Sequence, residues 1–155
     1  MTDPRNKLVI AAPWPVQYQR ALNIRNAVTM LITMKHPNFS LNLLAVDGER
    51  SLRQLRTPML TDIAQIVTHQ SIDVIVGDFN AISRSLGFEA FSADYQLVSQ
   101  AFWGWRGTWP TFLPLYDLDH IWVHQRFQLI KLDFLTHLAT DHRGQRIQFS
   151  RLVKQ

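Results

Sequence analysis

The sequence predicts a single strand-rich α/β domain. Two segments with alternating apolar residues, 25–34 and 39–46, lie on either side of a short turn and indicate a β-hairpin. A helix signal over 57–69 is followed by a short apolar segment, 73–76, of the kind that forms buried strands. The length of 155 residues suits one domain, and we expect residues 1–155 to form it without a linker.

The composition narrows the class of protein further. The chain is 46% hydrophobic and 18% charged, which is globular rather than disordered. It has no cysteine, which excludes disulfides, thiolate metal sites and cysteine nucleophiles. A net charge of +4 allows an anionic partner such as a phosphate ester without requiring nucleic acid. No apolar run approaches the roughly 18 residues of a membrane span, and no signal-peptide pattern opens the chain.

The first half of the chain is expected to begin with an edge strand. Residues 8–12 are apolar and are stopped by Pro13 and Pro15, which central strands do not tolerate. The hairpin follows, with its turn at 36–38. The dipeptide 57–58, Thr-Pro, is typical of an N-cap followed by the first helical residue, and the apolar stripe after it predicts a helix to about residue 69.

The second half has weaker periodic signals. Residues 81–100 suggest loops and short helices, whereas 118–123, 127–134 and 147–153 read as three further strands. An aromatic-rich segment, 101–116, lies between the region 81–100 and the strand expected at 118–123. Its rings either stack on bases or contact a lipid headgroup region, or they form a small core under a long loop, which is the commoner arrangement. They belong to Phe102, Trp103, Trp105, Trp109 and Phe112.

Three polar clusters stand at strand ends, where chemistry is often found. The first is Gly-Asp-Phe-Asn at 77–80, the second Asp-His at 119–120, and the third Asp-His-Arg-Gly at 141–144. Taken singly, an aspartate in such a place usually only caps a turn. His120 neighbours Asp119 on a strand, so its side chain points to the opposite face and is expected to pack in the core.

In their order, the three clusters resemble the endonuclease/exonuclease/phosphatase superfamily, whose fold is that of deoxyribonuclease I. The segment Val-Gly-Asp-Phe-Asn-Ala at 76–81 is especially close, and Thr-Trp-Pro at 108–110 is similar to another element of the family. The resemblance covers about residues 25–153. It implies a two-sheet β-sandwich flanked by helices, and a phosphoesterase that hydrolyses phosphodiesters or phosphomonoesters with an activated water.

The resemblance also implies a role for each residue. Asp78 would orient and deprotonate the water, and Asn80 would hold a phosphate oxygen. His142 would donate to a non-bridging phosphate oxygen, with Asp119 accepting from its other ring nitrogen. Asp78, Asn80 and Asp141 would hold Mg²⁺ or Mn²⁺. These roles agree with the needs of the reaction, which are a base for the water, a cation, and donors to the equatorial oxygens.

The sequence departs from the family pattern in its N-terminal part. Complete domains begin with a strand ending in Asn and a second strand ending in Gln-Glu, whose glutamate is the main metal ligand. Neither motif is visible, and the two glutamates, Glu49 and Glu89, lie in other contexts. We therefore expect the C-terminal two-thirds of a domain, metal binding in the millimolar range at best, and an apolar sheet surface covered by a second copy or by a partner supplying the missing strands. Some bacterial relatives carry membrane helices before the domain.

Further positions have two interpretations. Many family members have a phosphate-binding histidine where this chain has Asp47, which is either a metal ligand or a turn residue. Arg50, Arg53 and Arg56 either grip phosphate, Arg50 being the main candidate, or form a solvated basic face. The alternative to an enzyme is an incomplete domain without turnover that acts as a binding module or has no activity.

Overall fold

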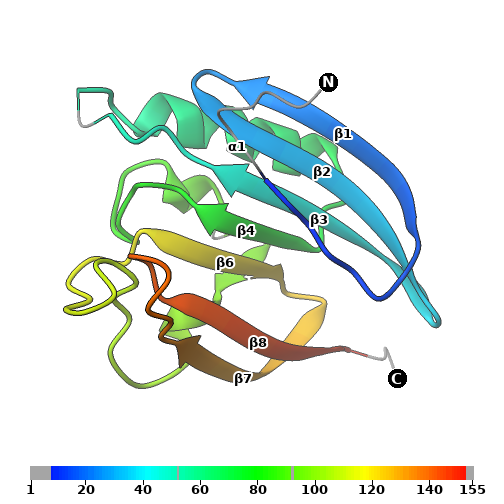
Figure 1. Ribbon diagram of the computed structural model, residues 1–155. Coiled ribbons are helices and arrows are strands. Elements are labelled where there is room, and N and C mark those ends of the chain that lie inside the picture. Colours follow the sequence, from blue (N-terminus) through cyan, green and yellow to red (C-terminus); the bar gives the residue numbers. More distant parts are fainter. Residues whose placement is uncertain (1–7, 52, 92, 153–155) are drawn as a thin grey trace.

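The structure is a computed structural model that describes residues 8–51, 53–91 and 93–152. Its strands form a six-stranded sheet in the order β1-β2-β3-β4-β6-β5 and a two-stranded sheet of β7 and β8 (Figure 1). The strands are β1 (Val16–Ile24), β2 (Ala27–His36), β3 (Phe39–Asp47), β4 (Val74–Asp78), β5 (Tyr95–Leu97), β6 (Asp119–His124), β7 (Phe127–Leu135) and β8 (Gly144–Arg151). This confirms the predicted α/β fold with two sheets.

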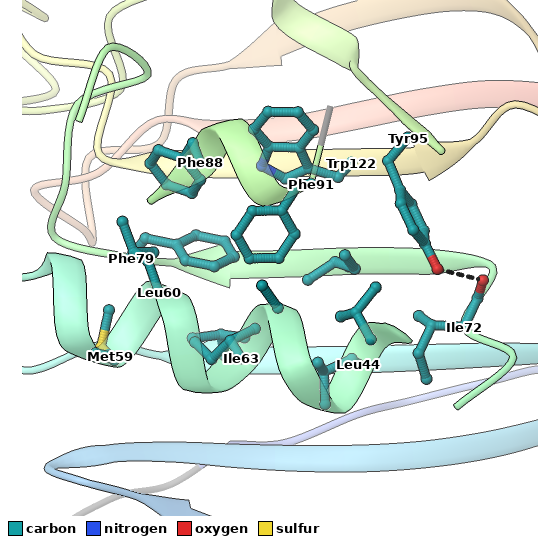
Figure 2. Packing of buried hydrophobic residues seen from close by; sticks show 14 of the residues in the cluster. Leu44, Met59, Leu60, Ile63, Ile72, Phe79, Phe88, Phe91, Tyr95 and Trp122 are labelled. Atoms are coloured by element: carbon teal, nitrogen blue, oxygen red, sulfur yellow. Dashed lines mark hydrogen bonds between the residues drawn. The ribbon is translucent and has the colours of Figure 1, made fainter. Parts of the chain in front are cut away.

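The helix α1 (Thr57–His69) connects β3 to β4, the one parallel pair in the larger sheet. Its buried residues, Met59, Leu60, Ile63, Ala64 and Val67, follow the helical spacing seen in the sequence and pack on the sheet (Figure 2). The predicted bounds are confirmed. The N-cap is Arg56 rather than Thr57, and it makes no side-chain capping bond. Two short 3₁₀ helices, η1 (Phe88–Ala90) and η2 (Val98–Gln100), follow.

The six-stranded sheet has two apolar faces. Because side chains alternate along a strand, Leu44, Ile75 and Trp122 face α1, and η1 covers the same side (Figure 2). The side chains of the intervening residues, such as Val76 and Ile121, point to the other face. There they form a second core with the inward-facing residues of β7 and β8.

Strand β1 is the main element that the sequence analysis missed. We expected a strand at 8–12, which is wrong: these residues form no strand, and two of them pack on the second apolar face. The strand lies instead at 16–24, and its turn contains Arg25, which we had placed inside the hairpin strand. Most of β1 is exposed at the sheet edge, so its alternation is weak, and the turn lacks the glycine that marks a tight hairpin.

An apolar groove of about 740 Å³ lies between the β2–β3 turn and β8, over the second face. Trp14, Phe39, Leu41, Ile147 and Phe149 are among the residues that line it. The expected dimer or strand-supplying partner stays a prediction, and the oligomeric state in solution would test it. Within the described part of the chain, no helix is long and apolar enough to cross a membrane.

Candidate active site

Three aspartates lie side by side at one end of the central strands of the larger sheet, where β3 and β4 end and β6 begins. In the register of the sheet, Asp47 of β3 pairs with Asp78 of β4, and Asp78 pairs with Asp119 of β6. Directly paired residues point to the same face of a sheet, here the face that carries β7 and β8. By sequence alone, Asp47 is either a metal ligand or a turn residue. The structure places it in the same row as the two predicted site aspartates.

His142 completes this cluster from the loop between β7 and β8. Its Nδ1 lies 2.8 Å from Oδ2 of Asp119, which confirms the hydrogen bond expected between them. Its Nε2 lies 4.0 Å from Oδ2 of Asp78. One ligand atom each from Asp78, Asp119 and His142 lies within 4.8 Å of the others. Residues separated by up to 64 positions in the sequence thus meet at one point.

The electrostatics of the cluster shift two pKa values. Burial raises the pKa of Asp78, and the neighbouring Asp119 and Asp47 carboxylates raise it further. Burial alone would lower the pKa of His142, but its hydrogen bond to Asp119 and the charges of Asp119, Asp78 and Asp141 outweigh burial and raise it. We expected crowded carboxylates to have raised pKa values, and Asp78 confirms this. The arrangement favours a cationic imidazole between anionic groups.

Gly77 allows the two strands of this row to approach closely. Its φ is +150°, and a Cβ at this position would lie 1.8 Å from the backbone oxygen of Val46. Any side chain would push β4 away from β3. The glycine that precedes Asp78 therefore helps to bring Asp47 and Asp78 into line.

Asn80 is held in the left-handed region, with φ of 48°, which asparagine tolerates better than most residues. Its backbone N–H donates to Oδ1 of Asp78 at 2.9 Å, and its side-chain amide nitrogen donates to the carbonyl of Gly48 at 3.2 Å. The amide nitrogen is thus already engaged with the loop after β3. The amide oxygen is the atom that Asn80 offers to a metal.

Asp141 lies apart from the three-residue cluster. Its side chain is fully exposed, and its Oδ2 accepts a hydrogen bond from Nε1 of Trp109 at 3.2 Å. This bond, together with His142 and Arg50 nearby, holds the pKa of Asp141 below its ordinary value. The ligand set expected from the sequence, Asp78, Asn80 and Asp141, stays a prediction; among the histidine, aspartate and glutamate side chains of the described residues, those close enough to share a metal are Asp78, Asp119 and His142.

Thr108 is a positioning residue that the sequence analysis noted only as part of a motif. It is fully buried, and its hydroxyl oxygen accepts hydrogen bonds from the backbone N–H groups of Leu118 and Asp119, at 3.0 and 3.1 Å. The backbone carbonyl of Thr108 in turn accepts from the N–H of Arg143 at 2.7 Å. The Thr-Trp-Pro motif thus ties the start of β6 to the loop that carries His142.

The three arginines after β3 differ in role. Arg50 is exposed, and its charge acts on Asp141, so it can reach an anion at this end of the strands. Arg53 is exposed. Arg56 donates instead to the carbonyls of Asn80, Ser51 and Gln54, at distances of 2.9 to 3.1 Å. Arg56 is therefore neither a free phosphate-binding group nor part of a solvated basic face, because its guanidinium joins the loops through these hydrogen bonds.

His120 packs in the core as expected. It lies on the α1 face, is 1% exposed, and has ring contacts with Phe79 and Phe88. Its Nε2 lies 2.6 Å from the carbonyl oxygen of Ala81, which only an Nε2–H can donate to. Burial lowers the pKa of His120, so the ring is neutral.

The fold and the site together define a two-sheet α/β protein with an aspartate–histidine cluster at one end of the central strands. Residues 3–142 match the model of the Endonuclease/Exonuclease/phosphatase family, and the chain belongs to this family. No curated protein sequence is similar enough to count as a match.

Several solved structures have the same fold. An endonuclease/exonuclease/phosphatase family protein from Bacteroides thetaiotaomicron is 12% identical with a TM-score of 0.75, covering 88% of this chain and 65% of its own. The human nocturnin catalytic domain is 17% identical with a TM-score of 0.70, covering 90% of this chain and 60% of its own. A mannosyl-6-phosphatase from the same Bacteroides species is 11% identical with a TM-score of 0.69, and the match covers 88% of this chain and 67% of the phosphatase. The chain thus spans less than two-thirds of the length of the first and second of these proteins.

Proposed function

We propose that the protein hydrolyses a phosphate ester with the help of a divalent cation. The observation that carries the proposal is the row of Asp47, Asp78 and Asp119 with His142 bonded to its last member. The nocturnin domain was solved with a sulfate anion, a group of phosphate-like shape, and another relative is named as a sugar phosphatase. These likenesses support the class of substrate, an anionic ester, and not its identity.

The residues around Asp78 fit a divalent cation chemically. Carboxylate and amide oxygens are the ligands that Mg²⁺ and Mn²⁺ prefer. Burial and negative neighbours disfavour a charged Asp78, and a cation held by Asp78 and the Asn80 amide oxygen would relieve that cost. Asp47 and Asp141 lie near enough to act on the charges of Asp78 and His142. When bound, the cation would neutralise charge on the phosphate and on the leaving oxygen.

His142 is suited to stabilise negative charge on the phosphate. Asp119 accepts a hydrogen bond from Nδ1–H, which fixes the tautomer and leaves Nε2 on the side of Asp78. The raised pKa of His142 keeps Nε2 protonated at higher pH, so it donates to a non-bridging oxygen. Asp119 acts through His142, as the orienting carboxylate does in hydrolytic triads.

Asp78 is suited to be the base for the water. Before a cation binds, burial and the neighbouring carboxylates raise the pKa of Asp78, and a carboxylate with a raised pKa is a stronger base than an ordinary one. It faces Nε2 of His142 at 4.0 Å. The two atoms are too close for a phosphate to lie between them, so a phosphate would lie beside the pair, where Nε2 donates to one of its oxygens and Asp78 accepts from the attacking water.

A second candidate function is binding without turnover. The acidic cluster found among the described residues contains no glutamate, and that is the observation that favours this alternative. Glu49, the nearer in sequence, accepts a hydrogen bond from the N–H of Ser51 at 2.9 Å, and Glu89 lines a separate cavity on the α1 side. A cation would then bind weakly, and the phosphate ester would be held but not cleaved.

Hydrolysis of bis(p-nitrophenyl) phosphate and of p-nitrophenyl phosphate by the full chain, with and without Mg²⁺ or Mn²⁺, tests the proposal. We expect cation-dependent release of nitrophenolate that Asp78→Asn and His142→Ala abolish. Asp62→Asn is the matched control, because Asp62 lies on α1 and pairs with Arg25. Hydrolysis that survives both site substitutions would place the chemistry elsewhere. Anion binding without hydrolysis would favour the second candidate.

A further inference from the structure

Large apolar side chains are exposed on two loops, 101–118 and 136–143, the second of which carries His142. Phe112 is 87% exposed, and Trp103 and Leu138 are fully exposed. Trp105, Leu113 and Leu115 are more than half exposed. We call these six residues the apolar rim. The expectation that the aromatic segment packs as a small core is therefore wrong for its three most exposed rings, because they point into solvent.

Five of the six residues of the apolar rim lie on one loop, 101–118, which has hydrogen bonds of its own, and Leu138 lies on the loop 136–143. Trp109 and Tyr116 form an antiparallel bridge at its base, and the indole N–H of Trp105 donates to the carbonyl of Pro114. The N–H of Leu113 donates to the carbonyl of Pro110 at 3.0 Å. Each backbone group that is bonded within the loop lowers the desolvation cost of entering an apolar environment.

The loop is fixed to the candidate active site. The N–H of Thr111 donates to the carbonyl of Asp141 at 2.7 Å, and its hydroxyl to the carbonyl of Thr140 at 3.0 Å. These bonds join the 112–115 part of the apolar rim to the loop of residues 136–143, which carries both Leu138 and His142. A surface that receives the apolar rim would therefore hold the site close to it.

The chemistry of the apolar rim favours a lipid–water interface. Tryptophan and phenylalanine next to leucine are typical of segments that bury a few ångströms into the boundary between headgroups and acyl chains. Three of the six side chains are leucines, which do not stack on nucleic-acid bases. The exposed Arg106 lies within the same loop and Arg50 at the site edge, which suits an anionic membrane surface.

We propose that the apolar rim inserts into an anionic bilayer surface, and that the ester that the site takes is the phosphate group of a lipid in that bilayer. The first part stands on the exposed side chains alone, whereas the second rests on the proposed function. Leu138 and His142 lie on the same loop, and Thr111 bonds to Thr140 and Asp141 of that loop, so a bilayer that receives the apolar rim would place its headgroups on the side of the molecule that carries His142.

Cosedimentation of the full chain with vesicles tests the surface. Vesicles of phosphatidylcholine alone are compared with vesicles that also contain phosphatidylglycerol. We expect binding to the anionic vesicles, weakened about tenfold or more in Trp103→Ser/Phe112→Ser, because each buried aromatic ring contributes strongly to partitioning. The matched control is Val16→Ser/Tyr18→Ser, which removes two exposed apolar side chains from β1 at the opposite edge of the sheet.

Two further measurements keep the proposal falsifiable. Brominated lipids should quench the tryptophan emission of the unmodified chain, which needs no variant that might fold poorly. Asp78→Asn should bind vesicles like the unmodified chain even if no hydrolysis is found, so that failure of the surface and failure of the proposed function are told apart. Hydrolysis of a soluble ester should be unchanged in the Trp103/Phe112 variant, while release from phospholipid vesicles should fall.

Equal vesicle binding by the Trp103/Phe112 variant and the unmodified chain would overturn the proposal, as would unquenched emission. Binding to single-stranded DNA that depends on the apolar rim, without binding to vesicles, would assign these side chains to nucleic acid instead. Vesicle binding combined with equal turnover of soluble and lipid esters would overturn the choice of substrate but not the surface.

Discussion

Replacing Asp78 by asparagine should stabilise the fold while it removes activity. Atoms of Asp78 and Asp119 lie within 4.8 Å of each other. At an effective dielectric constant of about 20, such a separation gives about 3 to 4 kcal/mol of repulsion between two charges. His142 at 4.0 Å from Asp78 offsets a similar amount when it is protonated. Solvent screening reduces both terms, and we expect a net gain of about 1 kcal/mol in the free energy of unfolding.

The stability gained in Asp78→Asn should depend on pH, and the raised pKa of Asp78 sets the direction of that dependence. The pKa of Asp78 is raised above its ordinary 3.8, so the folded state keeps the proton to a higher pH than the unfolded chain does. Its contribution to stability is therefore full below pH 3.8 and is lost as the pH rises through the raised pKa. The gain from Asp78→Asn should be largest in alkaline buffer, where His142 is neutral, and smallest in acid.

Urea denaturation of both proteins over a range of pH measures this difference. For a chain of this length, about 1 kcal/mol corresponds to a rise of about 3 °C in the midpoint of thermal unfolding. The control is Asp133→Asn, because Lys131 and Arg146 hold the pKa of Asp133 below its usual range and its charge is favourable in the fold. A loss of stability in Asp78→Asn, or a gain that is equal at all pH values, would refute the reasoning.

Three further outcomes are expected. Asp119→Asn removes the charge that raises the pKa of His142, so the alkaline limb of the pH profile of kcat/KM should move to lower pH; an unmoved limb would exclude the orienting role. Asp73→Ala removes the buried partner of the partly exposed Arg126 and the acceptor of the Asn42 N–H, and should cost about 1 to 3 kcal/mol in urea denaturation, whereas less than about 0.5 kcal/mol would show that the pair is unimportant. Mg²⁺ at about ten times a millimolar dissociation constant should raise the thermal midpoint by about 4 °C, and a midpoint independent of Mg²⁺ would contradict the cation site.

Local patterns were sufficient for much of the fold. The apolar stripe after Thr57 predicts α1 with its observed bounds, because helical spacing is a property of nearby residues. The hairpin strands and the three C-terminal strands were placed to within a few residues, although β8 begins at Gly144 rather than Ile147. Val153, the expected end of that strand, lies outside the described residues. Strand β1 was missed, since its exposed residues need no apolar pattern.

The candidate site was predicted in part, for a related reason. Asp78, Asp119 and His142 stand at strand or loop ends that the motifs mark, and their convergence is confirmed. Asp141 lies next to His142 in the sequence, yet its carboxylate accepts a hydrogen bond from Trp109 and is not part of the three-residue cluster. Only a contact between distant loops decides this, and no local pattern reports such a contact.

The sequence by itself determined the kinds of elements, the motifs at their ends and the family. The tertiary structure decided which strands pair and in which register. That register sets Asp47 beside Asp78 and Asp78 beside Asp119, and a shift by one residue would turn a side chain to the opposite face. It also decided that the apolar rim is exposed. Helix and strand periodicity arise from neighbours along the chain, whereas pairing and exposure depend on residues that meet only after the chain has folded.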